Sequence, residues 1–148
     1  MKDRLIYLLG TGFGCGYSPI APGTIGSLVA ILLFVLIPFS HIHWLIIALL
    51  TFLVGIRISG YIEAKTEKDP GIIVIDEYVG QWISLLFLPR SISVFLAGFF
   101  LFRFFDIVKP FPANISQRID GGLGVMLDDV WAGIYTNLIL QISTRFIF

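Results

Sequence analysis

The chain has 148 residues and a net charge of zero; 57% of its residues are hydrophobic and only 14% are Asp, Glu, Lys or Arg. A typical soluble domain is about 25% charged, and a water-soluble fold of this length could not bury so much apolar surface. Lipid must therefore cover part of the chain. The balanced charge excludes a general basic field that would attract nucleic acid. The single cysteine, Cys15, excludes a disulfide framework and a multi-cysteine zinc site.

Four apolar segments and a weaker fifth predict membrane helices, because a spanning helix needs about 20 mostly apolar residues. In chain order they are residues 25–39, 44–62, 73–88, 91–108 and 130–148. The third is long enough only if it carries Asp76 and Glu77 on its first turns. The fifth contains polar and charged side chains, and it either spans the membrane or lies along the interface. The sequence thus predicts one all-α domain over residues 1–148, a polytopic membrane protein with four to five membrane helices.

Basic residues gather on one side of this predicted topology. The connections at residues 41–43 and 89–91 are short and nearly uncharged. Eight of the ten basic residues lie in or beside the connections on the other side, namely Lys2, Arg4, Arg57, Lys65, Lys68, Arg103, Lys109 and Arg118. The positive-inside rule places these polar loops in the cytoplasm. Because the chain returns to this side after each apolar hairpin, its polar motifs could converge there on one site.

A glycine-rich segment precedes the first apolar helix. Residues 10–19 are Gly-Thr-Gly-Phe-Gly-Cys-Gly-Tyr-Ser-Pro, and Ala-Pro-Gly-Thr-Ile-Gly-Ser follows at 21–27. Glycine allows a close approach of the backbone to a ligand, and N–H groups in such a loop can cradle phosphate. A helix start also favours anions. We therefore predict substrate contacts at Gly12, Gly14 and Thr24. The alternative is a tight turn that only packs.

Two acidic pairs each stand at the start of an apolar helix. Asp76 and Glu77 follow an Asp-Pro-Gly turn and four apolar residues, and Asp128 and Asp129 follow a second glycine-rich segment. Carboxylates close to lipid are costly and are usually kept for function. Carboxylate oxygens are also the ligands that Mg²⁺ prefers. We therefore predict that the two pairs share a divalent cation. The alternative is that they only stabilise helix N-termini.

A third charged motif lies where the fourth apolar segment ends. Arg103, Asp106 and Lys109 are three residues apart, so they share one helix face. In a functional interpretation Asp106 is a metal ligand or general base, and the two basic side chains bind phosphate. In a structural interpretation Arg103 and Asp106 form an ion pair and Lys109 extends to the interface.

Taken in order, these motifs resemble the phosphatidylglycerophosphatase A family. The resemblance rests on the segments at residues 12–16, 21–27, 69–70, 76–80, 102–106, 109–112, 121–126 and 128–130. It implies a Mg²⁺-dependent phosphatase of the bacterial inner membrane with its active site facing the cytoplasm. Such an enzyme hydrolyses the terminal phosphomonoester of phosphatidylglycerophosphate to phosphatidylglycerol and phosphate, in phospholipid biosynthesis. The implied partners are this substrate and membrane lipids, with no nucleic acid.

Roles for the charged residues follow from the resemblance together with the motifs. Five carboxylates would be catalytic, namely Asp76, Glu77, Asp106, Asp128 and Asp129, and all except Asp106 would hold one or two Mg²⁺. Arg103 and Lys109 would bind substrate and offset charge on the phosphoryl oxygens. Three alternatives are a small transporter or ion-binding membrane protein, a non-catalytic assembly subunit and a CDP-alcohol transferase. The signature of the last, Asp-Gly-x-x-Ala-Arg, is not met at Asp120.

Overall fold

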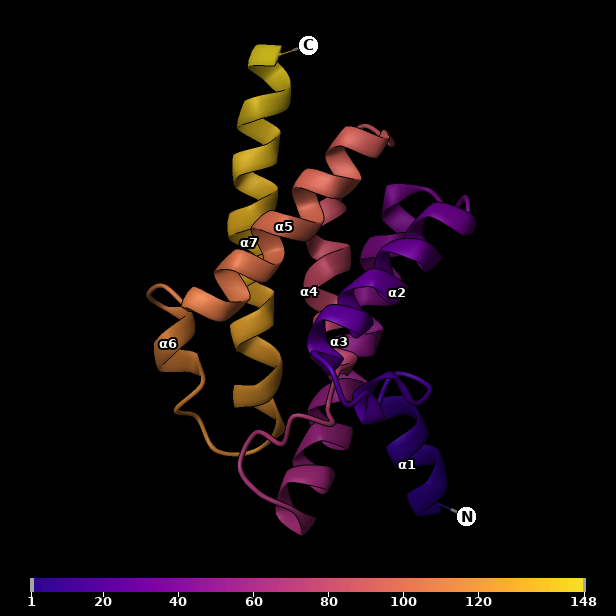
Figure 1. Cartoon of the computed structure of the whole chain (residues 1–148), viewed down its shortest axis with the longest axis vertical. Coiled ribbons are helices and arrows are strands. Elements are labelled where there is room, and N and C mark those ends of the chain that lie inside the picture. Colours follow the sequence, from indigo (N-terminus) through magenta and orange to yellow (C-terminus); the bar gives the residue numbers. More distant parts are fainter. Residues whose placement is uncertain (1, 148) are drawn as a thin grey trace.

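The computed structural model describes residues 2–147, and every regular element in that range is a helix (Figure 1). In chain order the elements are α1 (Lys2–Gly10), the 3-10 turn η1 (Cys15–Tyr17), α2 (Pro22–Leu36), α3 (His41–Lys65), α4 (Ile75–Leu85), α5 (Ile92–Val108), α6 (Ala113–Ser116) and α7 (Gly122–Ile147). The predicted all-α class is confirmed.

Helix α4 is the core of the bundle and packs against α2, α3, α5 and α7. Of its 11 residues only Glu77 and Ile83 are not fully buried. A helix that is buried all round is a core element rather than a surface one. Trp82 fixes its position, because the indole N–H donates to the Ala30 carbonyl over 3.0 Å and the ring lies against Trp44. The acidic pair at the start of α4 is therefore held inside the protein.

Two helices are long and apolar enough to cross a membrane, namely α3 and the stretch Gly122–Phe146 of α7. Helices α2, α4 and α5 have 15, 11 and 17 residues. At 1.5 Å per residue α4 rises only about 16 Å, against a hydrocarbon layer of about 30 Å. The predicted four to five membrane helices are therefore not confirmed. Hydropathy alone made α4 look like a short spanning segment, although most of its apolar surface contacts other helices.

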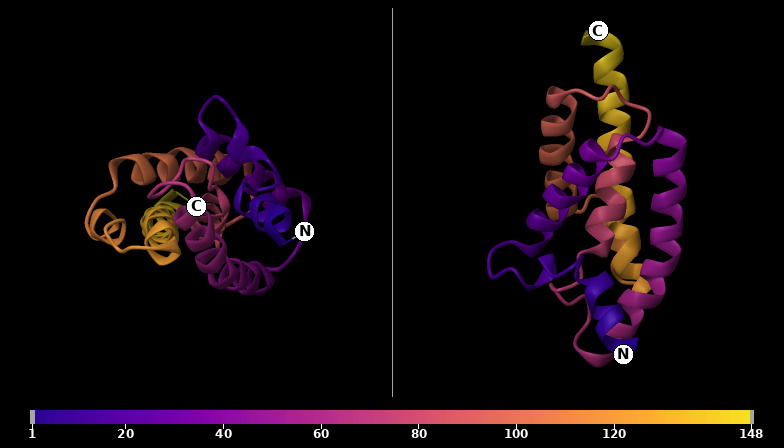
Figure 2. Two further views of the ribbon diagram at one scale, coloured as in Figure 1. Left: turned by 90° about the horizontal axis from the view of Figure 1, so that it is seen from below. Right: turned by 90° about the vertical axis from the view of Figure 1, so that its right-hand side faces the viewer.

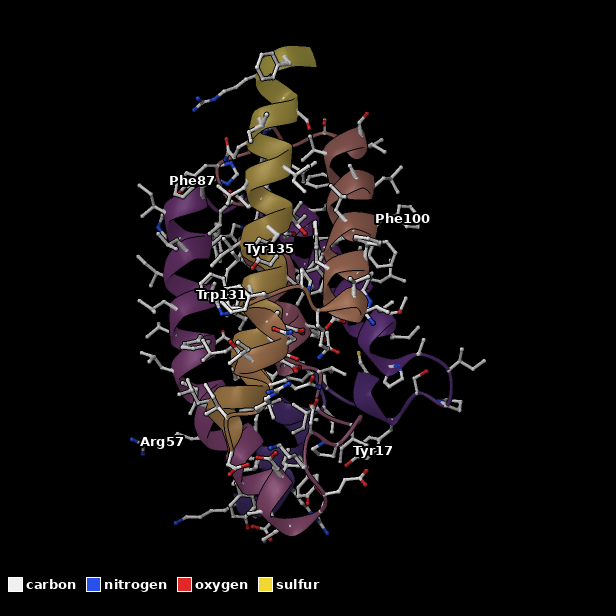
Figure 3. The ribbon with its side chains drawn as sticks, turned by 90° about the vertical axis from the view of Figure 1, so that its left-hand side faces the viewer. Tyr17, Arg57, Phe87, Phe100, Trp131 and Tyr135 are labelled. Atoms are coloured by element: carbon white, nitrogen blue, oxygen red, sulfur yellow. The ribbon has the colours of Figure 1, made fainter. Side chains whose placement is uncertain are left out.

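The bundle has two unlike ends (Figures 1 and 2). The α2–α3 and α4–α5 connections lie toward one end with the C-terminus, while the N-terminus and the α3–α4 connection lie at the other. Phe100 and Arg57 project away from the bundle (Figure 3). The outer face of α3 exposes an apolar row formed by Ile42, Leu45, Ile46, Leu49, Leu50, Leu53 and Val54. An exposed apolar row of this extent is typical of contact with lipid or another protein.

Arg90 lies in the α4–α5 connection and binds the C-terminal end of α2. Its guanidinium donates to the carbonyl oxygens of Phe39 and Ile37 over 3.0 and 3.3 Å, and also to that of Phe34. The last four carbonyls of a helix have no partner within the helix, so the bond to Phe34 satisfies one of them, while the bonds to Ile37 and Phe39 hold the residues that follow α2. We expect Arg90→Ala to lower the free energy of unfolding by about 1–2 kcal/mol.

The midpoint of thermal unfolding in detergent measures this effect. Arg145→Ala is the matched control, because Arg145 is exposed and makes no hydrogen bond or ion pair with the described residues. Equal midpoints for the two variants would show that Arg90 does not stabilise the end of α2.

Candidate active site

Two glycines set the distance between α4 and α7. Gly80 lies one turn after Asp76 and Gly133 lies one turn after Asp129, so each glycine shares a helix face with an acidic residue. A Cβ atom at Gly133 would collide with the Gly80 carbonyl oxygen and lie 3.2 Å from the Gly80 Cα. Only glycine permits this backbone contact. It brings the carboxylates at the start of α4 against those on α7.

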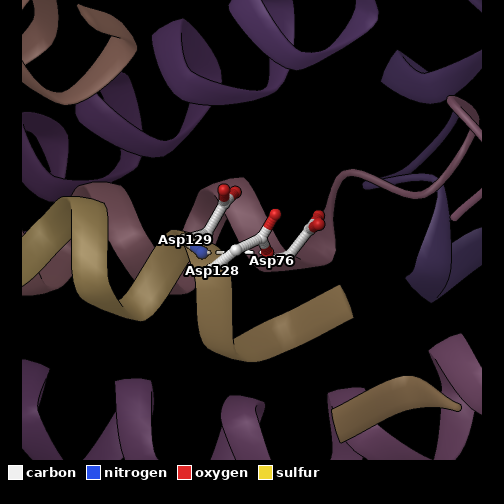
Figure 4. Close-up of side chains that lie close together, drawn as sticks. All are labelled: Asp76, Asp128 and Asp129. Carbon is white, nitrogen blue, oxygen red and sulfur yellow. Dashed lines mark hydrogen bonds between the residues drawn. The ribbon is translucent and has the colours of Figure 1, made fainter. Parts of the chain in front are cut away.

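The carboxylates of Asp76, Asp128 and Asp129 face a common space between α4 and α7 (Figure 4). One oxygen from each lies within 4.8 Å of the others. Glu77, Asp106 and Asp129 form a second group that meets the same condition, so Asp129 belongs to both. The structure thus brings all five acidic residues singled out in the sequence into one cluster, with α5 contributing Asp106.

The cluster is almost closed to solvent. Asp76, Asp128 and Asp129 are 7%, 4% and 2% exposed. Within each acidic pair the first carboxylate accepts a hydrogen bond from the N–H of the second residue, over 3.1 Å at Asp76 and 3.0 Å at Asp128. By contrast, Glu77 Oε2 and Asp129 Oδ2 are buried and have no hydrogen-bond partner among the described residues. Two buried carboxylate oxygens are therefore available to a ligand.

Two basic side chains face the cluster. Arg103 Nη1 lies 2.5 Å from Asp106 Oδ2 and 4.0 Å from Glu77 Oε1, so the ion pair of the structural interpretation is present. Lys109 Nζ pairs with Asp128 and lies 4.0 Å from Asp106 Oδ1. Burial lowers the pKa of Lys109, but the surrounding carboxylates, Asp128 foremost, outweigh it and raise the pKa above its usual value. Lys109 is therefore charged at neutral pH.

Backbone geometry aims Lys109 at the carboxylates. Its φ of 49° ends α5, and its N–H donates to the Phe105 carbonyl over 2.8 Å. A left-handed residue at this position is a common helix C-cap, and the proline that follows prevents the helix from continuing. The chain consequently turns back toward α7, which places the ammonium group of Lys109 beside Asp128.

The charged groups line a cavity of about 360 Å³. Its wall also includes the start of α2, the 69–71 turn and the apolar side chains of Ile73 and Ile107. Gly23 lets α2 come close, because a Cβ atom there would collide with Glu77 Oε1 and lie 3.1 Å from Arg103 Nη1. The sequence predicted a substrate contact at Thr24, whereas the residue of this helix start that lines the cavity is Gly23.

Asp69 lines the cavity although it was not among the predicted site residues. Its φ is 49°, its N–H donates to Glu63 Oε1 over 3.1 Å, and its Oδ2 accepts from Gln117 Nε2 over 3.1 Å. These bonds hold the turn between α3 and α4 over the site. The Asp-Pro-Gly sequence before Asp76 was the available signal, but it was interpreted only as a turn.

Three predicted substrate contacts, Gly12, Gly14 and Thr24, do not line the cavity. The Gly12 carbonyl accepts a hydrogen bond from the Tyr78 hydroxyl over 3.1 Å, and a Cβ atom at Gly12 would lie 2.7 Å from Val74 Cγ2. Gly12 therefore packs the glycine-rich loop against α4, as in the alternative interpretation of this segment. A role of these residues in substrate binding stays a prediction.

Comparison with known proteins identifies the family of this site. The family model described as Phosphatidylglycerophosphatase A matches residues 8–144, which include every carboxylate of the cluster. The chain belongs to the phosphatidylglycerophosphatase A family. It is therefore an enzyme of the phosphatase class, as the motifs predicted. No solved structure matches the chain significantly.

Curated relatives of this phosphatidylglycerophosphatase A family member have two kinds of name. A "Putative phosphatidylinositol-3-phosphatase" from Bacteroides thetaiotaomicron is 43% identical over 92% of this chain and 91% of its own length. A "Phosphatidylglycerophosphatase A" from Escherichia coli is 42% identical over 90% of this chain and 80% of its own length. Another of that name from Haemophilus influenzae is 42% identical over 91% of this chain and 86% of its own length.

Proposed function

We propose that this protein is a Mg²⁺-dependent lipid phosphatase that hydrolyses phosphatidylglycerophosphate to phosphatidylglycerol and phosphate, as a step of phospholipid biosynthesis. The observation that carries the proposal is the cavity in which five clustered carboxylates meet Arg103 and Lys109. Carboxylates can hold a divalent cation, and the two basic groups match the charge of a phosphomonoester. Two relatives that are 42% identical carry the name of this activity.

The donor set fits Mg²⁺. All candidate ligands are hard carboxylate oxygens, and Mg²⁺ binds such oxygens at about 2.1 Å, which puts opposite ligands about 4.2 Å apart. The oxygens of Asp76, Asp128 and Asp129 lie within 4.8 Å of one another, so small side-chain movements suffice. Asp129 Oδ2 is buried without a partner in the described chain. When bound, Mg²⁺ would act as a Lewis acid toward the phosphoryl oxygens.

The protein's own groups have distinct roles in the proposed reaction. Arg103 and Lys109 bind the phosphoryl oxygens and offset the charge that develops on them. Asp106, which Arg103 holds at 2.5 Å, is a further metal ligand or the general base for the attacking water. The first turn of α2 opens onto the cavity at Gly23, and the free N–H groups of a helix start favour an anion there.

We place the site at the cytoplasmic face of the bacterial inner membrane, in a multi-pass chain. Two helices are apolar and long enough to span, and the outer face of α3 is suited to lipid. The α4–α5 connection, which contains Arg90, and the C-terminal end of α7, which contains Arg145, lie toward one end of the bundle, whereas the N-terminus and the α3–α4 connection lie toward the other (Figure 1). Lys2, Arg4, Lys65 and Lys68 belong to that second end, and Arg103 and Lys109 line the cavity. This asymmetry supports a cytoplasmic site by the positive-inside rule.

A phosphorylated inositol lipid is the second candidate substrate, because the relative from Bacteroides thetaiotaomicron is named a putative phosphatidylinositol-3-phosphatase. Both candidates carry a phosphomonoester on a polyol head group, and the same carboxylates and basic side chains would act on either. The transporter alternative gains no support, since all three relatives are named as phosphatases.

Phosphate release by the purified protein in detergent tests the proposal. We expect release from phosphatidylglycerophosphate with Mg²⁺, loss of release in excess EDTA, and recovery when Mg²⁺ is restored. Phosphatidylinositol 3-phosphate is assayed in parallel at equal concentration. Release from the inositol lipid alone would move the assignment to the second substrate. No release from either lipid by protein with intact helical circular dichroism would overturn the proposal.

A further inference from the structure

We infer that the cavity binds two divalent cations that share the Asp129 carboxylate. Asp76 and Asp128 complete the first site, and Glu77 and Asp106 complete the second. The inference rests on the proposed function, because the first cation is the Mg²⁺ of that proposal. It goes further in assigning a second cation and the residues that hold it.

Helix geometry separates the ligands into two groups. Successive residues on a helix point about 100° apart, so Asp76 and Glu77 face different neighbours although they are adjacent. Asp76 faces Asp128 and Asp129, while Glu77 faces Asp106 and Asp129. In both groups one oxygen of each residue lies within 4.8 Å of the others. Pairs of close metal ions joined by a shared ligand are common in enzymes that cleave phosphate esters.

Unpartnered buried oxygens lie in the second group. Asp129 is 98% buried, being 2% exposed, and its Oδ2 has no hydrogen-bond partner among the described residues. Glu77 Oε2 is likewise buried and unpartnered. A buried ionised oxygen without a partner is costly, and proteins normally satisfy it with a hydrogen bond or a metal. Two of the three members of the second group thus have an oxygen free for a cation.

Arg103 is the competing explanation for the second group, since it lies 2.5 Å from Asp106 and 4.0 Å from Glu77. One guanidinium supplies one positive charge, which balances one of the three carboxylates. It makes no hydrogen bond to Glu77 Oε2 or Asp129 Oδ2, and its own Nε and Nη1 are also buried without a hydrogen-bond partner among the described residues. In the inferred arrangement Arg103 accompanies a cation in this group rather than replacing one.

Charge favours two cations over one. A carboxylate that binds a metal is ionised, and five ionised carboxylates against Arg103 and Lys109 give the cluster a net charge of −3. One divalent cation leaves −1, which would repel a phosphomonoester dianion at carboxylates that are themselves largely buried, where Coulomb forces are stronger than in water. Two cations give +1, which attracts it. The carboxylate of Asp69 at the cavity wall shifts the balance further toward two.

Binding of Mn²⁺ in place of Mg²⁺ tests the inference without an activity assay. Equilibrium dialysis of the detergent-solubilised full chain gives the stoichiometry, and electron paramagnetic resonance reports whether the ions are close. We expect two Mn²⁺ per wild-type chain with a spectrum broadened by coupling between them. Glu77→Gln should bind one Mn²⁺ and show the uncoupled six-line spectrum. Asp129→Asn should weaken the remaining binding at least about 10-fold, because both sites lose a ligand.

Glu67→Gln is the matched control, because Glu67 is exposed, lies outside the cavity and makes no ion pair with the described residues. It should keep two coupled ions. If Glu77→Gln does not fold, Asp106→Asn removes another ligand of the second site alone and should also bind one ion. One Mn²⁺ per wild-type chain at saturation, or two in folded Glu77→Gln, would overturn the inference. Phosphate release by a chain that binds one ion would leave the proposed function standing.

Discussion

Asp76→Asn is expected to slow phosphate release by about 10²- to 10³-fold, the usual effect of removing one electrostatic group from a preorganised site. The change is nearly isosteric, and the Asn side-chain oxygen can still accept the hydrogen bond from the Glu77 N–H that Asp76 accepts now. It removes one negative charge from a residue that is 7% exposed and groups with Asp128 and Asp129. The initial rate, measured against Mg²⁺ concentration, should also require more Mg²⁺ to reach half its maximum.

Asp120→Asn makes the same chemical change outside the cavity. The Asp120 side chain is 95% exposed and contacts Lys68 over 2.8 Å, and the hydrogen bond from Lys68 lowers its pKa. Exposed pairs of this kind contribute little to stability. We expect the wild-type rate and Mg²⁺ dependence for this variant. If Asp76→Asn behaved in the same way, the assignment of Asp76 as a metal ligand would be wrong.

Serine caps mark the starts of two helices. Helix α3 starts after Ser40, whose side chain accepts from the His43 N–H, and α5 starts after Ser91, which accepts from the Val94 N–H in the same way. Serine is a preferred residue at such positions. The predicted second segment, 44–62, did not use the signal at Ser40 and began three residues after the start of α3. The predicted fourth segment, 91–108, agrees with α5 to within one residue.

Burial in protein and burial in lipid could not be told apart from composition. Both favour apolar residues, so the segment 73–88 around α4 was predicted to be a membrane helix like the segment that became α3. Only the packing shows that α4 is surrounded by four helices whereas α3 exposes a continuous apolar face. The number of membrane crossings therefore could not be predicted from the sequence.

The residues of the site could be predicted from the sequence, but which carboxylates lie beside one another could not. Costly carboxylates next to apolar helices singled out Asp76, Glu77, Asp128 and Asp129, and the structure places them in one cluster. Which of them face each other depends on how α4 and α7 are rotated about their axes where they cross. These two helices are far apart in the sequence, so local patterns do not determine that rotation. The same limit explains Gly23, whose position is set by contact with a side chain on another helix.

The α4–α7 crossing leads to a second prediction of large effect. Gly133→Ala should lower the free energy of unfolding by roughly 1–3 kcal/mol, the usual cost of overpacking, and should reduce phosphate release strongly. Alanine in a helix is favoured over glycine by about 1 kcal/mol, so the clash must exceed this gain. It does so because the new Cβ meets the Gly80 carbonyl and lies 3.1 Å from the Gly80 carbonyl carbon, and backbone cannot rotate aside.

Separation of the two helices would act on the site directly, since Asp76 and Asp129 each lie one turn from the contact. Gly98→Ala is the matched control: it is also in a helix interior, but its Cβ would meet the tip of the Leu85 side chain at 2.7 Å, and this tip can move. We expect Gly98→Ala to keep both the unfolding midpoint and the rate of phosphate release. A stable, fully active Gly133→Ala would show that close backbone contact does not position the carboxylates. A stable Gly133→Ala that lost activity would show that catalysis depends on the helix spacing more steeply than folding does.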